Sequence, residues 1–232
     1  MIFLLLACEP NLPTEVTLSG TVYDAPYLTG AVVPGESLRS LDELGATVAT
    51  ATSGDDGSFE VVVPAGAPFF LLLEGDGHPT TSFSGSAGFV DLPAGEGIPW
   101  IATDAWEAEL RAAFVGCPTV AEGGTVVVGE LRQAISGFAP WDLPVATTAS
   151  VGITDSNGRS HVVCVLGEDD VAVESGAVGS NGIFAAFGLP EGPMIIETRY
   201  TTEAGEPLSD LYRGYAPAEG VAPFFPLYVA AT

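Results

Sequence analysis

The sequence predicts an all-β protein of two tandem antiparallel β-sandwiches, joined by a linker with one short helix. Two observations favour this fold class. The 29 glycines and 18 prolines among 232 residues lie between short apolar runs, where they mark turns between strands. In addition, the turn and strand pattern at Gly54–Phe69 recurs at Gly179–Met194, with its glycines, a phenylalanine and a Pro-x-Gly turn retained. We interpret each copy as the central hairpin of one sandwich.

The first module contains strands of alternating apolar and polar residues, separated by glycine turns. Phe69–Leu73 is apolar on both faces, so we predict that it is the most buried strand. Ser37–Leu44 suggests a helical turn, and residues 82–99, rich in Gly, Ser and Pro, suggest the end of the module and a connection. The other expected strands are residues 16–24, 46–52 and 59–63.

The order of these features resembles the carboxypeptidase regulatory-like (transthyretin-like) domain, over residues 16–81. The resemblance implies an antiparallel sandwich of seven or eight strands, an accessory or binding role, and no catalytic residues. It rests on the Gly-Ala-x-Val strand at 45–48, the Gly-x-x-Gly-x-Phe turn at 54–59, the Pro-x-Gly turn at 64–66, the apolar strand and Gly77-His78.

The linker has the helical periodicity that the rest of the chain lacks. Asp104 and Glu107 have the spacing of a capping box. An apolar stripe that includes Trp106, Leu110 and Phe114 is expected to pack on or between the sandwiches. The second module then has a strong hairpin turn at 155–158 and expected strands at 125–131, 149–154, 160–166, 194–200 and 224–229.

The N-terminal apolar run ends in Leu5-Leu6-Ala7-Cys8, which resembles a bacterial lipobox. The resemblance implies acylation of Cys8, cleavage after Ala7, and a lipid-anchored protein of the bacterial envelope, for which we expect the outer membrane. The alternative is a frayed apolar terminus with an ordinary cysteine. The expected organisation is a signal segment at 1–7, a tether at 8–15, a first sandwich at 16–99, a linker at 100–120 and a second sandwich at 121–232.

The formal net charge of −24 comes from 30 acidic residues against six arginines and no lysine. A surface this acidic excludes binding to nucleic acid and electrostatic attachment to anionic lipid. It keeps the protein solvated, or it attracts divalent cations. Asp55-Asp56 and Glu168-Asp169-Asp170 offer oxygen ligands to calcium, but neither has a known loop spacing, so we expect no metal or other cofactor.

Cys117 and Cys164 remain after Cys8, and in an exported protein two cysteines are expected to pair, the alternative being two buried thiols. The sequence offers little that is typical of a catalytic site. His78 and His161 are the two histidines of the chain, and no His-Glu-x-x-His spacing occurs, so we expect no enzyme activity.

The sequence therefore predicts a non-enzymatic envelope lipoprotein whose sandwiches serve a structural, adhesive or binding role, with the membrane and an envelope protein or carbohydrate as partners. The alternative is a carbohydrate- or solute-binding lipoprotein with Phe138, Trp141, Tyr212 and Tyr215 as stacking surfaces. A third hypothesis, an envelope hydrolase, needs a histidine beside a carboxylate and a nucleophile.

Overall fold

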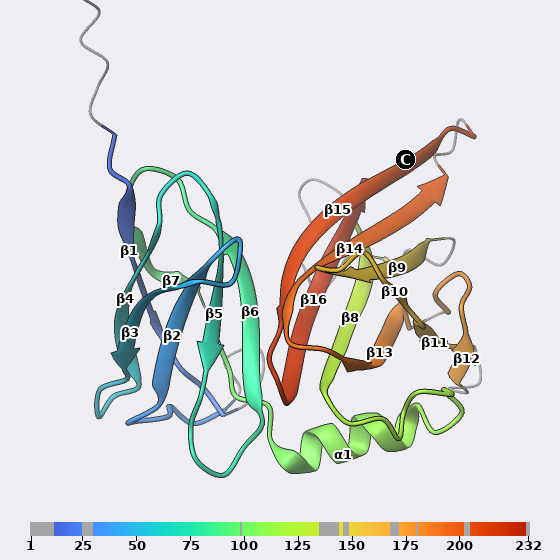
Figure 1. Cartoon of the computed structure of the whole chain (residues 1–232), viewed down its shortest axis with the longest axis horizontal. Coiled ribbons are helices and arrows are strands. Elements are labelled where there is room, and N and C mark those ends of the chain that lie inside the picture. The colour runs from blue at the N-terminus through green and yellow to red at the C-terminus, as the bar shows by residue number, and fades with distance from the viewer. Residues whose placement is uncertain are drawn as a thin grey trace, which may run out of the picture.

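The computed structural model describes residues 12–24, 30–97, 99–134, 144–145, 149–167, 172–179, 181–201 and 205–230. These residues form three β-sheets and one helix, and the all-β prediction is confirmed. Two β-sandwiches stand side by side, with the helix below the second (Figure 1).

The first sandwich packs a three-stranded sheet against four strands of a larger sheet. The three-stranded sheet has the order β4 (Ser58–Pro64), β1 (Glu15–Thr21) and β7 (Leu92–Gly97). The facing strands are β6 (Thr80–Ser86), β5 (Pro68–Leu73), β2 (Ser37–Asp42) and β3 (Thr47–Thr52). Alternate residues of these strands point inward and form one buried apolar core, as the alternation in the sequence requires.

The second sandwich packs a four-stranded sheet against the other five strands of the larger sheet. The four-stranded sheet has the order β10 (Ser160–His161), β9 (Ser150–Asp155), β14 (Gly192–Thr201) and β15 (Pro207–Ala216). The facing strands are β12 (Ala172–Glu174), β11 (Cys164–Leu166), β13 (Ile183–Leu189), β8 (Thr125–Ala134) and β16 (Gly220–Ala230).

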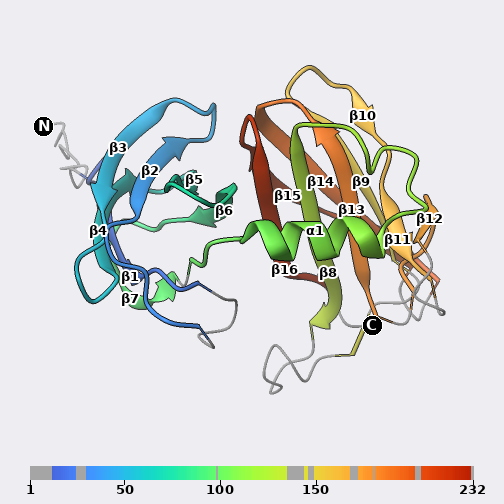
Figure 2. The same cartoon turned by 90° about the horizontal axis from the view of Figure 1, so that it is seen from below.

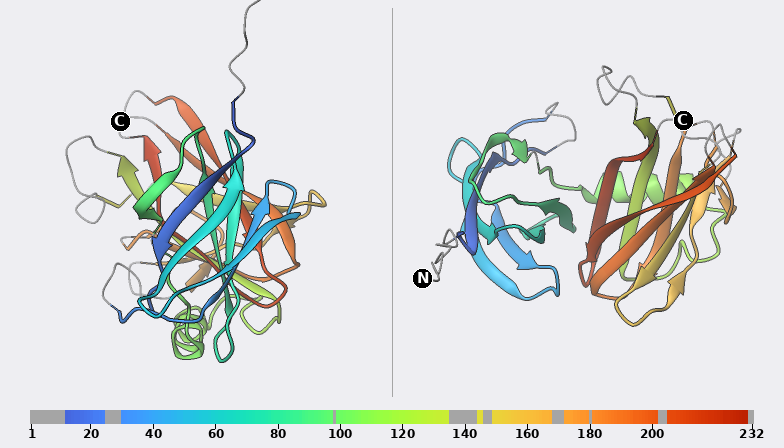
Figure 3. Two further views of the ribbon diagram at one scale, coloured as in Figure 1. Left: turned by 90° about the vertical axis from the view of Figure 1, so that its left-hand side faces the viewer. Right: turned by 90° about the horizontal axis from the view of Figure 1, so that it is seen from above.

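The larger sheet is continuous through both sandwiches, in the order β12-β11-β13-β8-β16-β6-β5-β2-β3. Strand β16 lies between β8 and β6 and is parallel to both, and β1 and β7 also pair in parallel. The expectation of purely antiparallel sheets was therefore wrong at these three pairings. Seen from above, the two sandwiches lie side by side (Figure 3).

The helix α1 (Asp104–Ala113) covers the outer face of the second sandwich. Seen from below, it crosses the strands of that sandwich (Figure 2). Phe114, directly after it, is buried against Phe187 with ring centroids 5.8 Å apart, as the expected apolar stripe predicts. The N-cap is Thr103, whose hydroxyl accepts from the Trp106 N–H at 3.1 Å, so the assignment of this role to Asp104 was one residue late.

The repeated turn has the same geometry in both copies. Gly57 and Gly182 both have φ of +74°, which only glycine adopts without strain. Asp56 accepts from the Ser58 N–H at 3.0 Å, and Asn181 accepts from the Ile183 N–H at 3.2 Å. The acidic and amide side chains are therefore equivalent turn residues.

The strands after the repeated turn do not form the hairpin that the sequence suggested. In the first copy β4 and β5 lie in opposite sheets of the sandwich, and in the second copy β13 and β14 do the same. The Pro-x-Gly turn thus carries the chain across the core. Each of these strands has its hydrogen-bonding partners in its own sheet, which the local sequence does not specify.

Three segments differ from their expected structure. Ser37–Asp42 is a strand, because Leu38 and Leu41 lie in two separate apolar clusters on its two faces and do not form one helical stripe. Residues 82–99, expected to end the first module and connect it onward, contain part of β6 and all of β7, which belong to the first sandwich. The strand expected at 160–166 is divided between β10 and β11, which belong to different sheets.

Candidate functional site

The two sandwiches are joined by a very short stretch of strand pairing. Gly220 and Val221 at the start of β16 pair with Thr80 and Thr81 at the start of β6, and the pairing ends there. Gly220 has φ of +148°, and a Cβ at this position would collide with the carbonyl oxygen of Thr80. Glycine is therefore required for the two strands to meet.

A buried apolar contact reinforces the junction. Leu41, Phe70 and Leu72 project from the outer faces of β2 and β5, and Tyr215 of β15 completes the cluster. The Tyr215 side chain is 5% exposed, and its ring centroid lies 5.6 Å from that of Phe70. The second sandwich thus covers the outward face of Phe69–Leu73, and all five residues are buried, as the sequence predicted.

Polar groups surround this apolar contact. The Tyr215 hydroxyl donates to Glu191 at 3.1 Å, and Arg213 forms an exposed ion pair with Glu43 of the first sandwich at 3.0 Å. Burial of the phenol, followed by the nearby Glu191 charge, raises the pKa of Tyr215 to about 12. The phenol is therefore neutral and serves as a hydrogen-bond donor at physiological pH.

Beyond the junction, β6 and β16 diverge (Figure 1). A groove of about 520 Å³ lies between the sandwiches there. No further pairing joins β6 to β16 among the described residues, so one edge of each strand faces this groove. The groove combines aromatic faces, hydroxyl groups and one guanidinium. Its lining includes Phe83, Ser84, Ser86, Tyr212, Arg213 and Phe225.

The structure separates the aromatic residues that the sequence grouped together. Tyr212 lines the groove, whereas Tyr215, three residues later on β15, points to the opposite face and is buried. The stacking role expected for Tyr215 is therefore wrong. Phe138 and Trp141 lie outside the described residues. Both tyrosines belong to the regular strand β15.

Three groove aromatics were not identified from the sequence: Phe83, Phe224 and Phe225. Phe83 lay in a segment interpreted as a linker, although its strand had the alternation Phe-Ser-Gly-Ser. The consecutive Phe224 and Phe225 were a detectable signal, because adjacent strand residues point to opposite faces and both faces must then be covered.

Each histidine is bonded to one buried carboxylate, and the two lie in different sandwiches. His78 Nε2 is 3.1 Å from Glu36 Oε2 in the first sandwich, and His161 Nε2 is 3.0 Å from Asp155 Oδ2 in the second. The Asp155 carboxylate also accepts a hydrogen bond from the backbone N–H of Arg159. This bond, together with the bond to His161, lowers the pKa of Asp155. These contacts hold turns in place.

Cys117 and Cys164 are joined by a disulfide with their Cα atoms 5.9 Å apart. It ties the segment after α1 to strand β11, and both residues belong to the apolar cluster beneath the helix. Cys8 lies outside the described residues. The disulfide therefore fixes the helix layer on the second sandwich.

Of the residues considered as calcium ligands, Asp56 forms hydrogen bonds within its own turn. Hydrogen bonds from the Ser58 hydroxyl and N–H lower the pKa of Asp56, and no cluster of three metal-binding side chains occurs among the described residues. Glu168, Asp169 and Asp170 lie outside them. Within the same residues, no helix has the length and apolar character to cross a membrane.

No protein-family model and no curated protein matches this sequence. Among solved structures it is similar to the TIE protein of Bacillus anthracis, with 13% identity and a TM-score of 0.32 over 94% of this chain. It spans 34% of that chain. The minor pilin GBS52 of Streptococcus agalactiae is 11% identical, with a TM-score of 0.31 over 93% of this chain and 94% of its own. The shaft pilin SpaA of Lactobacillus rhamnosus GG is 9% identical, with a TM-score of 0.29 over 94% and 98%. Likeness this distant carries no information about function.

Proposed function

We propose that this protein is a non-enzymatic, lipid-anchored protein of the bacterial cell envelope, which presents two sandwiches, residues 16–99 and 121–232, as one rigid unit in a structural, adhesive or binding role. The observation that carries the proposal is the coupling of the sandwiches by a shared sheet and by the buried contact around Phe70 and Tyr215. Flexibly linked domains lack such a contact, and a rigid pair holds its surfaces in a fixed relation.

The placement of the histidines favours this role over a hydrolase. A hydrolytic site needs a histidine that accepts a proton from a nucleophile and is oriented by a carboxylate. His78 and His161 are both buried and belong to separate sandwiches, so they do not combine into one site. The proposal therefore assigns both His–carboxylate pairs to the stability of the fold.

The anchor is supported by the resemblance of Leu5-Leu6-Ala7-Cys8 to a lipobox. With a net charge of −24, the protein is not held on a membrane by electrostatic attraction. Acyl chains would hold it instead, because each buried methylene contributes about 0.8 kcal/mol. Cys8→Ser is expected to release the protein into the soluble fraction on membrane fractionation. Ala7→Gly keeps a small residue before the cysteine and is the matched control, expected to stay with membranes. Retention of Cys8→Ser with the membranes would contradict the anchor.

A second candidate function, carbohydrate binding, is favoured by the groove. Sugar rings present apolar faces and hydroxyl groups, and the groove offers the aromatic rings of Tyr212 and Phe225 beside Ser84, Ser86 and Arg213. Calorimetric titration with envelope polysaccharide fragments tests this directly. Tyr212→Ala should weaken binding by roughly 2- to 10-fold.

The control for this titration is Phe89→Ala, which removes an exposed aromatic ring that does not line the groove. It should leave the affinity unchanged. Equal affinities for Tyr212→Ala and the parent protein would remove the groove as the binding site.

A further inference from the structure

Three exposed apolar side chains lie at one end of the first sandwich, and we call them the apolar tip. They are Leu12, Phe89 and Val90, which are 53%, 48% and 71% exposed. Phe89 and Val90 belong to the turn between β6 and β7, and Leu12 precedes β1. An apolar group exposed in this way on an otherwise acidic protein indicates a surface that something covers.

Backbone hydrogen bonds hold the parts of the apolar tip together. The Ala65 N–H donates to the carbonyl oxygen of Thr14, and the Gly66 N–H donates to that of Gly88, both at 2.9 Å. The Thr17 N–H donates to the Asp91 carboxylate at 2.7 Å. The turn that carries Phe89 and Val90 is therefore fixed beside the residues through which the chain enters β1.

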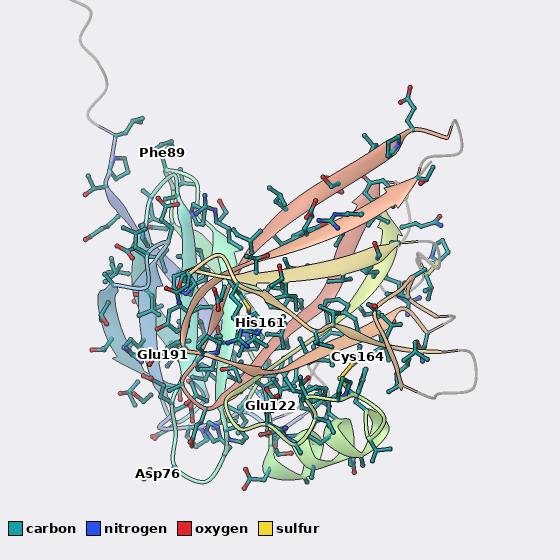
Figure 4. All side chains as sticks on the ribbon, turned by 45° about the vertical axis from the view of Figure 1, so that its right-hand side comes forward. Asp76, Phe89, Glu122, His161, Cys164 and Glu191 are labelled. Atoms are coloured by element: carbon teal, nitrogen blue, oxygen red, sulfur yellow. A yellow bond between two sulfur atoms is a disulfide. The ribbon has the colours of Figure 1, made fainter. Side chains whose placement is uncertain are left out.

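The Phe89 ring is itself held in place. It lies over Gly66, where an added Cβ would be 2.5 Å from the ring. Figure 4 shows Phe89 at the end of the first sandwich where β1 begins, with Asp76 at the opposite end. Packing and hydrogen bonds therefore fix the position of Phe89 at this end of the first sandwich.

The length of chain between Cys8 and Leu12 limits how far the tip can lie from a membrane. Four residues span at most about 14 Å when fully extended. The headgroup layer on each side of the hydrocarbon core is itself about 5–8 Å thick. If Cys8 carries acyl chains, Leu12 therefore lies no more than about 6–9 Å beyond the headgroups. The turn that carries Phe89 and Val90 is held beside Thr14, two residues further along the chain.

We propose that the apolar tip inserts into the headgroup–acyl boundary of the membrane that holds the lipid anchor. The inference rests on the proposed lipid anchor. Glu15 and Asp91 flank the tip and are repelled by anionic headgroups, so the proposal applies to a zwitterionic surface. Repulsion between two chains of net charge −24 disfavours a second copy as the occupant.

The inserted tip would fix the orientation of the protein. A lipid anchor alone is a single point about which the protein can tilt. A second contact at Phe89 and Val90 holds the first sandwich upright, with the turn at Asp76 directed away from the bilayer.

The test places a tryptophan in the tip of the acylated full-length protein. Phe89→Trp is reconstituted into vesicles of phosphatidylcholine with brominated acyl chains, which quench tryptophan within the bilayer. Asp76→Trp is the matched control, because Asp76 is exposed in the turn at the opposite end of the first sandwich. The protein already has three tryptophans, so each variant is compared with its parent.

The added tryptophan of Phe89→Trp should be quenched about twofold or more and shift to the blue, and that of Asp76→Trp should not change. Val90→Trp should behave like Phe89→Trp, and it preserves the contact of Phe89 with Gly66. Vesicle flotation in the same samples reports on the anchor. Floating protein whose tip tryptophans are no more quenched than the control overturns the tip and leaves the anchor standing. Parent protein that fails to float overturns both.

Discussion

The buried phenol of Tyr215 makes the stability of this protein sensitive to alkaline pH. Its pKa is about 12 in the folded protein, against about 10 for an exposed tyrosine. The folded-state pKa is the higher of the two, so its contribution to stability is complete below pH 10 and is lost as the pH rises through 12. Ionisation of this phenol then opposes the contact between the sandwiches.

The size of the effect follows from the two pKa values. At pH 11 the unfolded chain is about ten times more readily ionised at this residue than the folded chain. Relative to pH 8, this lowers the free energy of unfolding by about 1.4 kcal/mol, and by less where water screens the charge of Glu191. The chain has no lysine, so no side-chain amine titrates in this range.

The assay is urea denaturation of the parent protein and of Tyr215→Phe at pH 8 and pH 11. Tyr215→Phe keeps the ring against Phe70 and removes the ionisable hydroxyl. The parent should lose about 1.4 kcal/mol more than the variant between the two pH values. Absorbance at 295 nm gives a second measurement, since the difference between the two proteins reports Tyr215 alone. Equal losses in the parent and the variant would refute the reasoning.

Four further predictions concern the junction and the disulfide. Gly220→Ala should separate β6 from β16, because its Cβ meets the carbonyl oxygen of Thr80, and urea denaturation should then show two transitions. A single transition of unchanged midpoint would contradict this. Phe70→Ala removes a buried ring and should lower the free energy of unfolding by about 3–5 kcal/mol in the same assay. Mass analysis of unreduced, alkylated protein should find Cys117 and Cys164 unmodified, and alkylation at both would show free thiols. Their double replacement by serine should cost about 4 kcal/mol.

Local patterns in the sequence predict much of this fold. Alternating residues locate most of the strands, glycines locate their turns, and the run Phe69–Leu73 identifies a strand buried on both faces. The same patterns fail where two different layers cover one strand. Leu38 and Leu41 are three residues apart, a spacing typical of a helix, but one faces the core of the first sandwich and the other faces the second sandwich. Only the tertiary arrangement distinguishes these cases.

The groove was less predictable than the strands, because its residues come from distant parts of the chain. Phe83 and Phe225 face one cavity only after β16 has paired with β6. The alternation along β15 indicates that Tyr212 and Tyr215 point in opposite directions, but it does not indicate which side is covered. The distribution of charges along the sequence does not indicate the groove either, because the partner of Arg213 is Glu43 of the other sandwich.

The position of β16 has a consequence for the order in which the protein folds. It is the last strand described along the chain, yet it lies between β8 and β6 in the middle of the largest sheet. During synthesis, the edges of β6 and β8 that pair with β16 stay unpaired until residues 220–230 emerge. Contacts over such long sequence separations form slowly, and open strand edges recruit other chains. The high negative charge protects this stage, because nascent chains that repel one another do not pair at their exposed edges.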